Sequence, residues 1–431
     1  MSVWCERLIV DGAVRDRVRL SADEAGSVTA ITEGEGPRAG DLVLGTAMPG
    51  VADAHSHAFH RALRGRTHDR GGDFWTWREL MYRAASRLTP ELYGRLARGV
   101  FAEMVVAGYT AVGEFHYVHH RPDGTAYPHE MELALVEAAR DVGIRLTLLD
   151  TAYLAGGIGA PLSAEQRRFG DAGAEAYLRR WHELAAQVPG LGAAIHSVRA
   201  ASPADVRTIV AGLPEDVPLH IHLSEQPQEN EAATVAFGLT PTELLAREGM
   251  LSARMSAVHA THLTDADVRL LGAAEVSIVM CPTTEADLGD GIGPARALLD
   301  AGATLSIGSD QNAVVDPFLE IRGLEMHERL GSLRRGRFTL AELGRAAGAG
   351  GYRSLGHAAP ATIGGPLDLI EIDAQSSRTV GSEPAQLLLS ATAADVQRVV
   401  VGGRVVASGG ALSNGERPAA LLASVLEEVL G

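Results

Sequence analysis

The chain has 431 residues, of which 46% are hydrophobic and 21% are charged, and this balance excludes a disordered polypeptide. Its length suits one large domain with a smaller companion. The formal net charge of −16 opposes a nucleic-acid-binding surface, because phosphate contacts need clustered cations.

The two ends of the chain have the texture of β-structure. Between about residues 5 and 48, short apolar runs separated by turns predict strands, at 7–10, 28–31 and 41–44. Similar runs return at 367–372 and at 399–406, where a Gly-Gly pair suits a hairpin turn. We expect the two ends to pair into one domain. The start lacks the apolar stretch of a signal peptide, so a cytoplasmic location is expected.

Between these ends, strand-like runs alternate with amphipathic, alanine-rich helical stretches. The predicted strands are 111–113, 146–149, 193–195, 219–222, 256–259, 276–279 and 304–307. Such alternation is typical of parallel βαβ units, and the commonest single domain of this length built from them is a closed α/β barrel. A doubly wound open sheet is the competing architecture.

Polar residues that can bind metals fall at the ends of the predicted strands. His55 and His57 are two residues apart, so on a strand both imidazoles point to the same face and can reach one ion. A single pair with this spacing is more often a coincidence than a metal site. The pair gains weight only if further metal-binding residues occur later in the chain.

Three later strand ends carry residues of the same kind. His222 ends a strand and is followed by Glu225, which offers a third ligand and an acid/base group. His220 lies on the same face, so the spacing leaves open which of these two histidines binds. His259 and Asp310 close two further apolar runs. Each could be a buried, hydrogen-bonded structural residue, but four strand ends in succession favour a metal site.

This set of residues resembles the amidohydrolase superfamily over essentially the whole chain. The resemblance implies a (β/α)8 TIM-type barrel beside a small β-sandwich domain formed by both termini. The implied domains are 1–49 for the first part of the sandwich, 50–365 for the barrel and 366–431 for the second part of the sandwich.

The same resemblance implies roles for the strand-end residues. The implied metal ligands are His55, His57, His222 and Asp310. The implied catalytic residues, which act on a water molecule and the substrate, are Glu225, His259 and Asp310.

The absence of lysine decides the number of metal ions. Many members of the superfamily hold two ions bridged by a carboxylated lysine, and this chain contains no lysine at all. We therefore expect one divalent ion. Zinc suits three imidazoles and a carboxylate, and Fe²⁺ or Mn²⁺ is also compatible. Only Cys5 and Cys281 occur, far apart, which excludes a cysteine-rich zinc site.

Four longer motifs resemble the formimidoylglutamate deiminase family of histidine degradation. They lie at 73–82, 108–120, 196–200 and 284–292. This family hydrolyses N-formimidoyl-L-glutamate, a linear amidine, to N-formyl-L-glutamate and ammonia. The resemblance implies that the substrate carboxylates are held by Arg78, Tyr117, His196 and Arg199. Paired guanidinium groups suit a dianionic amino-acid derivative.

The sequence departs from this family at two places. His60 stands where the family commonly has glutamine, and we expect it to contact a substrate carboxylate as that glutamine would. Gln311 and Asn312 follow the metal-binding aspartate where Ser-His is common. The wall of the site is therefore expected to differ there.

Other functions make different demands on the sequence. A deaminase of guanine or of an s-triazine would need stacking residues and few cations. A non-catalytic interaction protein would have lost metal ligands, and an open-sheet hydrolase would need a nucleophile elbow, which we do not find. The expected partner is therefore a small dianionic amino-acid derivative, with no nucleic acid and no membrane, and a homodimer is compatible with the sequence.

Overall fold

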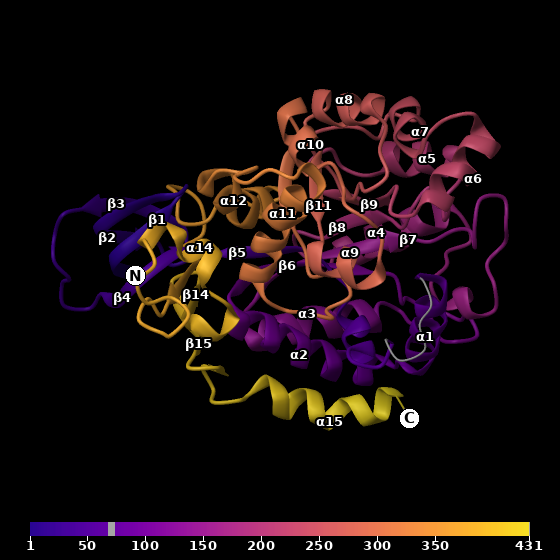
Figure 1. Cartoon of the computed structure of the whole chain (residues 1–431). Helices are drawn as coiled ribbons and strands as arrows, with labels where there is room; N and C mark the ends of the chain where they lie inside the picture. The colour runs from indigo at the N-terminus through magenta and orange to yellow at the C-terminus, as the bar shows by residue number, and fades with distance from the viewer. Residues whose placement is uncertain (68–73, 431) are drawn as a thin grey trace.

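The computed structural model describes residues 1–67 and 74–430. Asp73, the first residue of the motif at 73–82, lies outside the described residues. The described elements form two eight-stranded sheets, one at each side of the molecule (Figure 1). No described helix is both long and apolar enough to span a membrane.

The larger unit is a parallel α/β barrel. Its eight strands pair in chain order, and a parallel bridge between Ser56 and Asp310 joins the last strand to the first. The strands are β5 (Val51–Ser56), β6 (Tyr109–His116), β7 (Arg145–Ala152), β8 (Gly192–Ile195), β9 (Leu219–Leu223), β10 (Met255–His259), β11 (Ser277–Met280) and β12 (Thr304–Ile307). Each predicted internal strand overlaps one of these. The closed barrel is confirmed over the open sheet.

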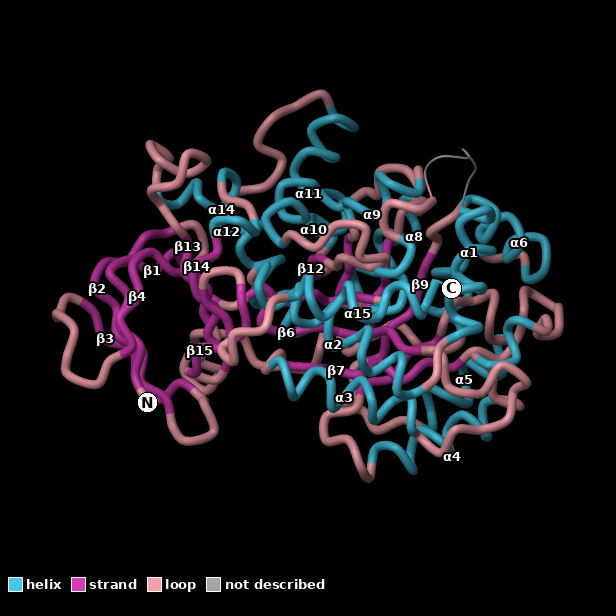
Figure 2. Tube along the Cα trace, turned by 90° about the horizontal axis from the view of Figure 1, so that it is seen from below, coloured by secondary structure: helices cyan, strands magenta, loops and turns pink. Residues whose placement is uncertain are grey.

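Helices surround the barrel strands (Figure 2). Their bounds are α1 (Phe74–Arg87), α2 (Pro90–Ala107), α3 (Glu130–Val142), α4 (Ala174–Ala185), α5 (Pro203–Gly212), α6 (Pro227–Phe237), α7 (Pro241–Arg247), α8 (Asp265–Ala273), α9 (Pro282–Leu288), α10 (Ala295–Ala301), α11 (Pro317–Ser332), α12 (Leu340–Arg345) and α13 (Gly351–Ser354). Several begin at a capping box, in which a Ser or Thr and an acidic residue three positions later satisfy each other's backbone N–H groups. These cap residues are Ser202, Thr240, Thr264 and Thr339.

The smaller unit is a sheet built from both ends of the chain. Its strands are β1 (Ser2–Val10), β2 (Ala13–Ala22), β3 (Val28–Glu33), β4 (Leu42–Pro49), β13 (Leu369–Ile372), β14 (Val396–Val401), β15 (Arg404–Ser408) and β16 (Ala411–Leu412). Strand β4 pairs antiparallel with β13, which joins the two ends as expected. The Gly402-Gly403 turn between β14 and β15 has positive φ angles of 56° and 77°, which glycine adopts without strain.

The two units meet where β4 ends and β5 begins. A Cβ atom on Gly50 would lie 2.4 Å from Thr110 Oγ1 and 2.9 Å from Asp368 Cβ, so only glycine fits at this junction. The Gly50 N–H donates to the Asp368 carbonyl at 2.8 Å. The amino end of the barrel therefore rests directly on the terminal sheet.

The last segment of the chain is helical. Helix α14 (Leu387–Ser390) precedes β14, and α15 (Pro418–Leu430) lies along α2 of the barrel (Figure 1). Buried Leu422 packs against Gly99, where a Cβ atom would come within 2.9 Å of its Cδ2. The domain boundaries at 49/50 and 365/366 remain a prediction.

Candidate metal centre and active site

The carboxyl ends of the barrel strands bring together the four predicted metal ligands. His55 is in β5, His57 directly precedes the short helix η1 (Ala58–Leu63), His222 is in β9 and Asp310 follows β12. All four side chains are buried. The end of a barrel strand is where catalytic residues of this architecture are found.

Four of the distances between these side chains match those expected around a single tetrahedral ion. His222 Nε2 is 3.1 Å from His55 Nε2 and 3.4 Å from His57 Nε2. Asp310 Oδ1 is 3.3 Å from His55 Nε2 and 3.5 Å from His57 Nε2. Zinc binds such atoms at about 2.0–2.1 Å, so the ligand atoms of a tetrahedral site lie about 3.3–3.4 Å apart. The donor set therefore fits a divalent ion such as zinc.

Hydrogen bonds to backbone carbonyls orient two of these imidazoles. The Nδ1 of His57 donates to the Phe115 carbonyl at 2.8 Å, and the Nδ1 of His222 donates to the His196 carbonyl at 2.9 Å. These bonds leave Nε2 with its lone pair toward the ion, as in known metal sites. Burial lowers the pKa of His57 to about 3 and that of His222 well below 6.5. Neutral imidazoles of this kind are ready to bind a metal.

The structure places His222, and not His220, beside the other ligands. The Nε2 of His220 lies 2.8 Å from the carbonyl of Ser354, the last residue of α13, and donates to it. Both side chains point to the same face of β9, but His220 is one layer nearer the amino end of the barrel. Depth in the barrel therefore favours His222 over His220, the two candidates that the spacing left open.

Hydrogen bonds between β5 and the segment after β12 hold the loops that carry the predicted metal ligands. Asp53 accepts hydrogen bonds from the N–H and the hydroxyl of Ser309 at 2.9 and 2.5 Å. The amide of Asn312 donates to the His57 and Asp310 carbonyls, each at 3.1 Å. Asp310 and Asn312 have positive φ angles of 46° and 56°, a strained conformation that such bonds can hold in place.

Glu225 and His259 lie beside the ligand cluster. His259 Nε2 is 3.8 Å from both Glu225 Oε1 and Asp310 Oδ2, and its Nδ1 is 3.6 Å from Glu285 Oε1. Burial lowers the pKa of His259, but these carboxylates outweigh burial and raise it to about 10. Burial raises the pKa of Glu225, which favours its protonated form. The pair can therefore hold and transfer protons.

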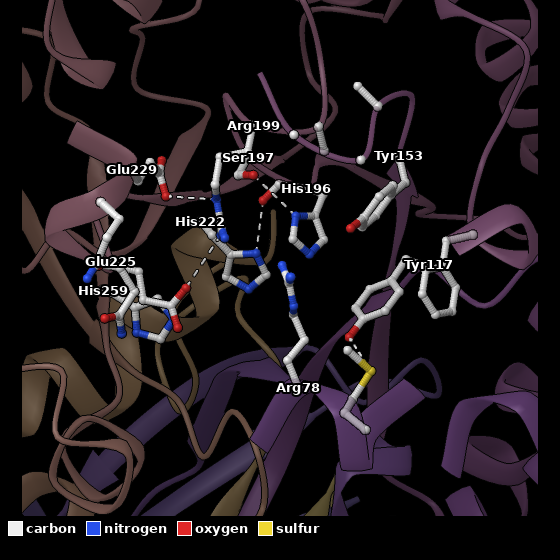
Figure 3. A pocket seen from close by; sticks show the side chains of 18 of the residues that line it. Arg78, Tyr117, Tyr153, His196, Ser197, Arg199, His222, Glu225, Glu229 and His259 are labelled. Atoms are coloured by element: carbon white, nitrogen blue, oxygen red, sulfur yellow. Dashed lines mark hydrogen bonds and ion pairs between the residues drawn. The ribbon is translucent and has the colours of Figure 1, made fainter. Parts of the chain in front are cut away.

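Three of the predicted ligands, His57, His222 and Asp310, line a cavity of about 340 Å³. Its wall contains all five residues predicted to contact the substrate, which are His60, Arg78, Tyr117, His196 and Arg199. Figure 3 shows Arg78 from α1 converging with Tyr117, His196 and Arg199, which lie in loops after barrel strands, and Tyr153 also points inward. Tyr153 and Glu229 also line the cavity, and no motif in the sequence had identified them.

His60 turns toward the cavity wall. Its Nε2 lies 3.0 Å from the hydroxyl of Tyr117, and burial lowers its pKa well below 6.5. The imidazole is therefore neutral and hydrogen-bonded to a residue of the predicted carboxylate site. Among the described residues, no hydrogen bond or ion pair joins His60 to Asp310.

The two arginines of the cavity have different surroundings. Arg78, on α1, has its guanidinium carbon 5.6 Å from the centre of the Tyr82 ring. Arg199 lies between two carboxylates, with its Nε 3.3 Å from Glu229 Oε2 and its NH2 3.7 Å from Glu225 Oε2. Glu229 is in the first turn of α6, four residues after Glu225, and only the tertiary fold brings it to Arg199.

A second group of histidines lies behind this wall. His119 Nδ1 donates to Glu132 Oε1 at 2.7 Å, and His116 Nε2 is 3.3 Å from the same oxygen. The guanidinium of Arg180 lies 2.6 Å from Asp150 Oδ1 and 3.7 Å from that oxygen of Glu132. Arg180 thus already supplies positive charge to these carboxylates, so the group is a buried charge network.

Known proteins resemble this chain in sequence and in fold. The model of the amidohydrolase family matches residues 46–406. The chain is 37% identical to a formimidoylglutamate deiminase of Pseudomonas aeruginosa, over 100% of this chain and 99% of that protein. A 5-methylthioadenosine/S-adenosylhomocysteine deaminase of Halobacterium salinarum is 28% identical over 92% of this chain and 89% of its own. A solved amidohydrolase from Brucella melitensis has a TM-score of 0.92 at 30% identity, with 100% of each chain covered.

Proposed function

The chain belongs to the amidohydrolase family, and from this premise we propose that it hydrolyses N-formimidoyl-L-glutamate to N-formyl-L-glutamate and ammonia. The observation that carries the proposal is one cavity that holds both a metal-ligand cluster and two arginines. The full-length relative at 37% identity, a formimidoylglutamate deiminase, supports the same substrate.

We propose one zinc ion, bound by His55, His57, His222 and Asp310. Four ligand–ligand distances of 3.1–3.5 Å support this choice, and the absence of lysine argues against a bridged second ion. When bound, such an ion supplies the Lewis acidity that makes a water molecule nucleophilic near neutral pH.

Three residues of the chain then handle protons. Asp310 accepts the proton of the water molecule, and His259, whose Nε2 lies 3.8 Å from Asp310 Oδ2 and whose raised pKa keeps it protonated, orients that water molecule as a hydrogen-bond donor. Glu225, at 3.8 Å from the same Nε2, carries a proton to the nitrogen that leaves as ammonia. Burial raises the pKa of Glu225, which makes it easier for this carboxylate to take up the proton that it passes on.

The cavity wall holds the glutamate portion of the substrate. Arg78 and Arg199 each offer a guanidinium group for one carboxylate, and Tyr117 and His196 add hydrogen-bonding groups between them. His60 supports this side through its hydrogen bond to Tyr117. The substrate is thereby oriented with its formimidoyl carbon toward the ligand cluster.

An ammonia-release assay over a panel of substrates tests the proposal. The panel contains N-formimidoyl derivatives of L-glutamate, L-aspartate and glycine together with guanine, 8-oxoguanine and 5-methylthioadenosine. We expect turnover of the glutamate derivative, slower turnover of the aspartate derivative and none of the purines. Release of ammonia from a purine and not from the glutamate derivative would overturn the proposal.

A further inference from the structure

Glu229 is a buried carboxylate in the wall of the cavity that the proposed reaction does not use. Its side chain is fully buried, and neither oxygen accepts a hydrogen bond of ordinary geometry from the described residues, although the Ser224 backbone N–H is near enough to lower its pKa. Its nearest charged neighbour is Arg199, whose Nε lies 3.3 Å from Glu229 Oε2 (Figure 3). Burying a carboxylate costs free energy unless its charge is paired, so its contact with Arg199 calls for an explanation.

The geometry of Arg199 gives Glu229 a purpose. A guanidinium group is planar, and its donors point in fixed directions. Glu229 approaches the Nε atom, whereas the NH2 group points toward Glu225 on the cavity side, at 3.7 Å. The terminal nitrogens therefore face the space in which a substrate carboxylate would lie. The ion pair at Nε, 3.3 Å from Glu229 Oε2, therefore favours the orientation in which the terminal nitrogens face the substrate.

The electrostatics of the pair agree with this geometry. Arg199 is 16% exposed, so its charge needs a nearby counterion when the cavity contains no substrate. Burial raises the pKa of Glu229 to about 7, although Arg199 opposes this rise. The negative charge of Glu229 therefore depends on the arginine, as expected for two groups that act as one unit.

We propose that Glu229 is a positioning residue that holds Arg199 in the orientation needed to grip a carboxylate of the substrate. The inference rests on the proposed function, because it names a recognition element of the same cavity. Glu229 does not touch the reacting atoms in this proposal. It acts on the affinity for dicarboxylates through the direction of the Arg199 side chain.

The test compares E229Q with wild-type enzyme in the ammonia-release assay. Loss of the anchoring charge should raise KM for N-formimidoyl-L-glutamate about tenfold and change kcat by less than about threefold. In E229D the carboxylate is one methylene shorter, so a smaller rise of about threefold is expected. Should E229Q fail to fold, E229D supplies the same test. An unchanged KM in the folded variant would overturn the inference.

A double-mutant cycle separates positioning from a general structural role. R199M removes the group that Glu229 is proposed to hold, so E229Q should have no further effect on KM in the R199M background. Equal effects of E229Q in both backgrounds would overturn the inference. E248Q is the matched control, because Glu248 is a buried carboxylate that pairs with Arg207 and Arg247 outside the cavity. It should leave KM unchanged.

Failure of the proposed function can be distinguished from failure of this inference. If wild-type enzyme releases no ammonia from N-formimidoyl-L-glutamate, the proposed function fails. Calorimetric binding of glutarate, a bare dicarboxylate, then tests Glu229 alone. We expect about tenfold weaker binding in E229Q and no additional loss in the E229Q/R199M double variant. Glutarate binding by E229Q equal to that of wild type would overturn the inference.

Discussion

The terminal sheet and the mouth of the barrel both bury charged side chains, but they satisfy them differently. In the terminal sheet, Glu371 Oε1 accepts from the Gly45 N–H at 2.6 Å and from Arg398 at 2.8 Å. At the barrel mouth, the oxygens of Glu229 and the Nδ1 atoms of His60 and His259 have no hydrogen-bond partner of ordinary geometry among the described residues, although His259 Nδ1 lies 3.6 Å from Glu285 Oε1. The fold satisfies the buried charge of the terminal sheet, whereas the barrel mouth contains polar atoms that can still form hydrogen bonds.

This difference indicates what each region is built for. Buried polar groups in native proteins are nearly all hydrogen-bonded, so a cluster of unsatisfied ones needs a reason. The mouth also concentrates strained backbone, with positive φ angles at Ser224 (49°), His259 (68°) and Asp310 (46°). In the proposed function, a metal ion and a dianionic substrate supply partners for the ligand cluster and for the two arginines of this mouth. The sheet needs no ligand and contributes stability.

The largest effect should follow removal of the metal, which affects the mouth alone. Dialysis against a chelator should abolish ammonia release, and one equivalent of zinc per chain should restore it. At a free metal concentration of about 100–1,000 times Kd, metal binding adds roughly 2.7–4.1 kcal/mol to the free energy of unfolding. The metal-free protein should therefore melt at a lower temperature. Elemental analysis finding two tightly bound ions per chain would contradict the single site.

The next effect should come from Glu225→Gln at the same end of the barrel. Loss of the acid/base group should lower kcat by about 10²–10⁴-fold. The metal content should stay at one ion per chain, because Glu225 is not among the proposed ligands. The melting temperature should not fall, since the change removes a buried carboxyl that no hydrogen bond satisfies in full. Loss of metal in this variant would instead make Glu225 a ligand.

The opposite pattern is expected for Asp368→Asn, where the sheet meets the barrel. Asp368 accepts hydrogen bonds from Arg145 at 3.2 Å, from the Tyr352 hydroxyl at 2.6 Å and from the Gly402 N–H at 2.6 Å. The variant should lose about 1.5–3 kcal/mol of unfolding free energy. Because this site lies at the amino end of the barrel, kcat should change less than about twofold. Urea unfolding and the ammonia assay measure both.

The sequence predicted the features of the barrel that depend on local pattern. The barrel strands follow from apolar runs, and the metal ligands follow from polar residues where those runs stop. Strand β2 was missed because its first half is charged and exposed, and it is a strand only through pairing with β1. Helix α15 was also missed, since its apolar face is explained only by α2, far away in the chain.

The supporting residues of the site could not be predicted for a similar reason. Asp53 and Ser309 are 256 positions apart, and only closure of the barrel brings them into hydrogen-bonding distance. Glu229 contacts Arg199 across two strand-to-helix connections. A single sequence shows which residues can bind a metal, but the contacts that orient them are set by the tertiary fold.

A smaller effect is expected in the terminal segment at acidic pH. Burial would raise the pKa of Asp395, but hydrogen bonds from Arg378, Ser376 and Thr392 lower it to about 2. A lowered pKa stabilises the fold above the unfolded value near 4 and ceases to do so as the pH falls towards 2. The stability difference between wild type and Asp395→Asn should therefore be constant from pH 6 to 4 and shrink below pH 4. Urea unfolding at several pH values measures it.

The smallest effect should come from His60→Gln, which tests whether His60 acts at the barrel mouth only through a hydrogen bond. His60 lies 3.0 Å from the Tyr117 hydroxyl, and a glutamine amide can make the same hydrogen bond. One such bond is worth about 0.5–1.5 kcal/mol, so a partial loss should change KM by only a few-fold. The metal should stay bound, because His60 is directed to Tyr117 and the four ligands already complete a tetrahedral set.

The pH profile of this variant separates two roles of the imidazole. Burial lowers the pKa of His60 well below 6.5, so the ring is neutral from pH 6 to 8 and adds no titration to KM there. His60→Gln should therefore keep the wild-type dependence of KM on pH in that range. His60→Leu, which removes the hydrogen bond, is the control and should raise KM more than His60→Gln. Loss of a titration step near neutral pH in the glutamine variant would show that the imidazole is charged and pairs directly with a substrate carboxylate. Loss of metal in His60→Gln would place His60 among the metal ligands. The imidazole of His60 would then serve the metal and not the substrate.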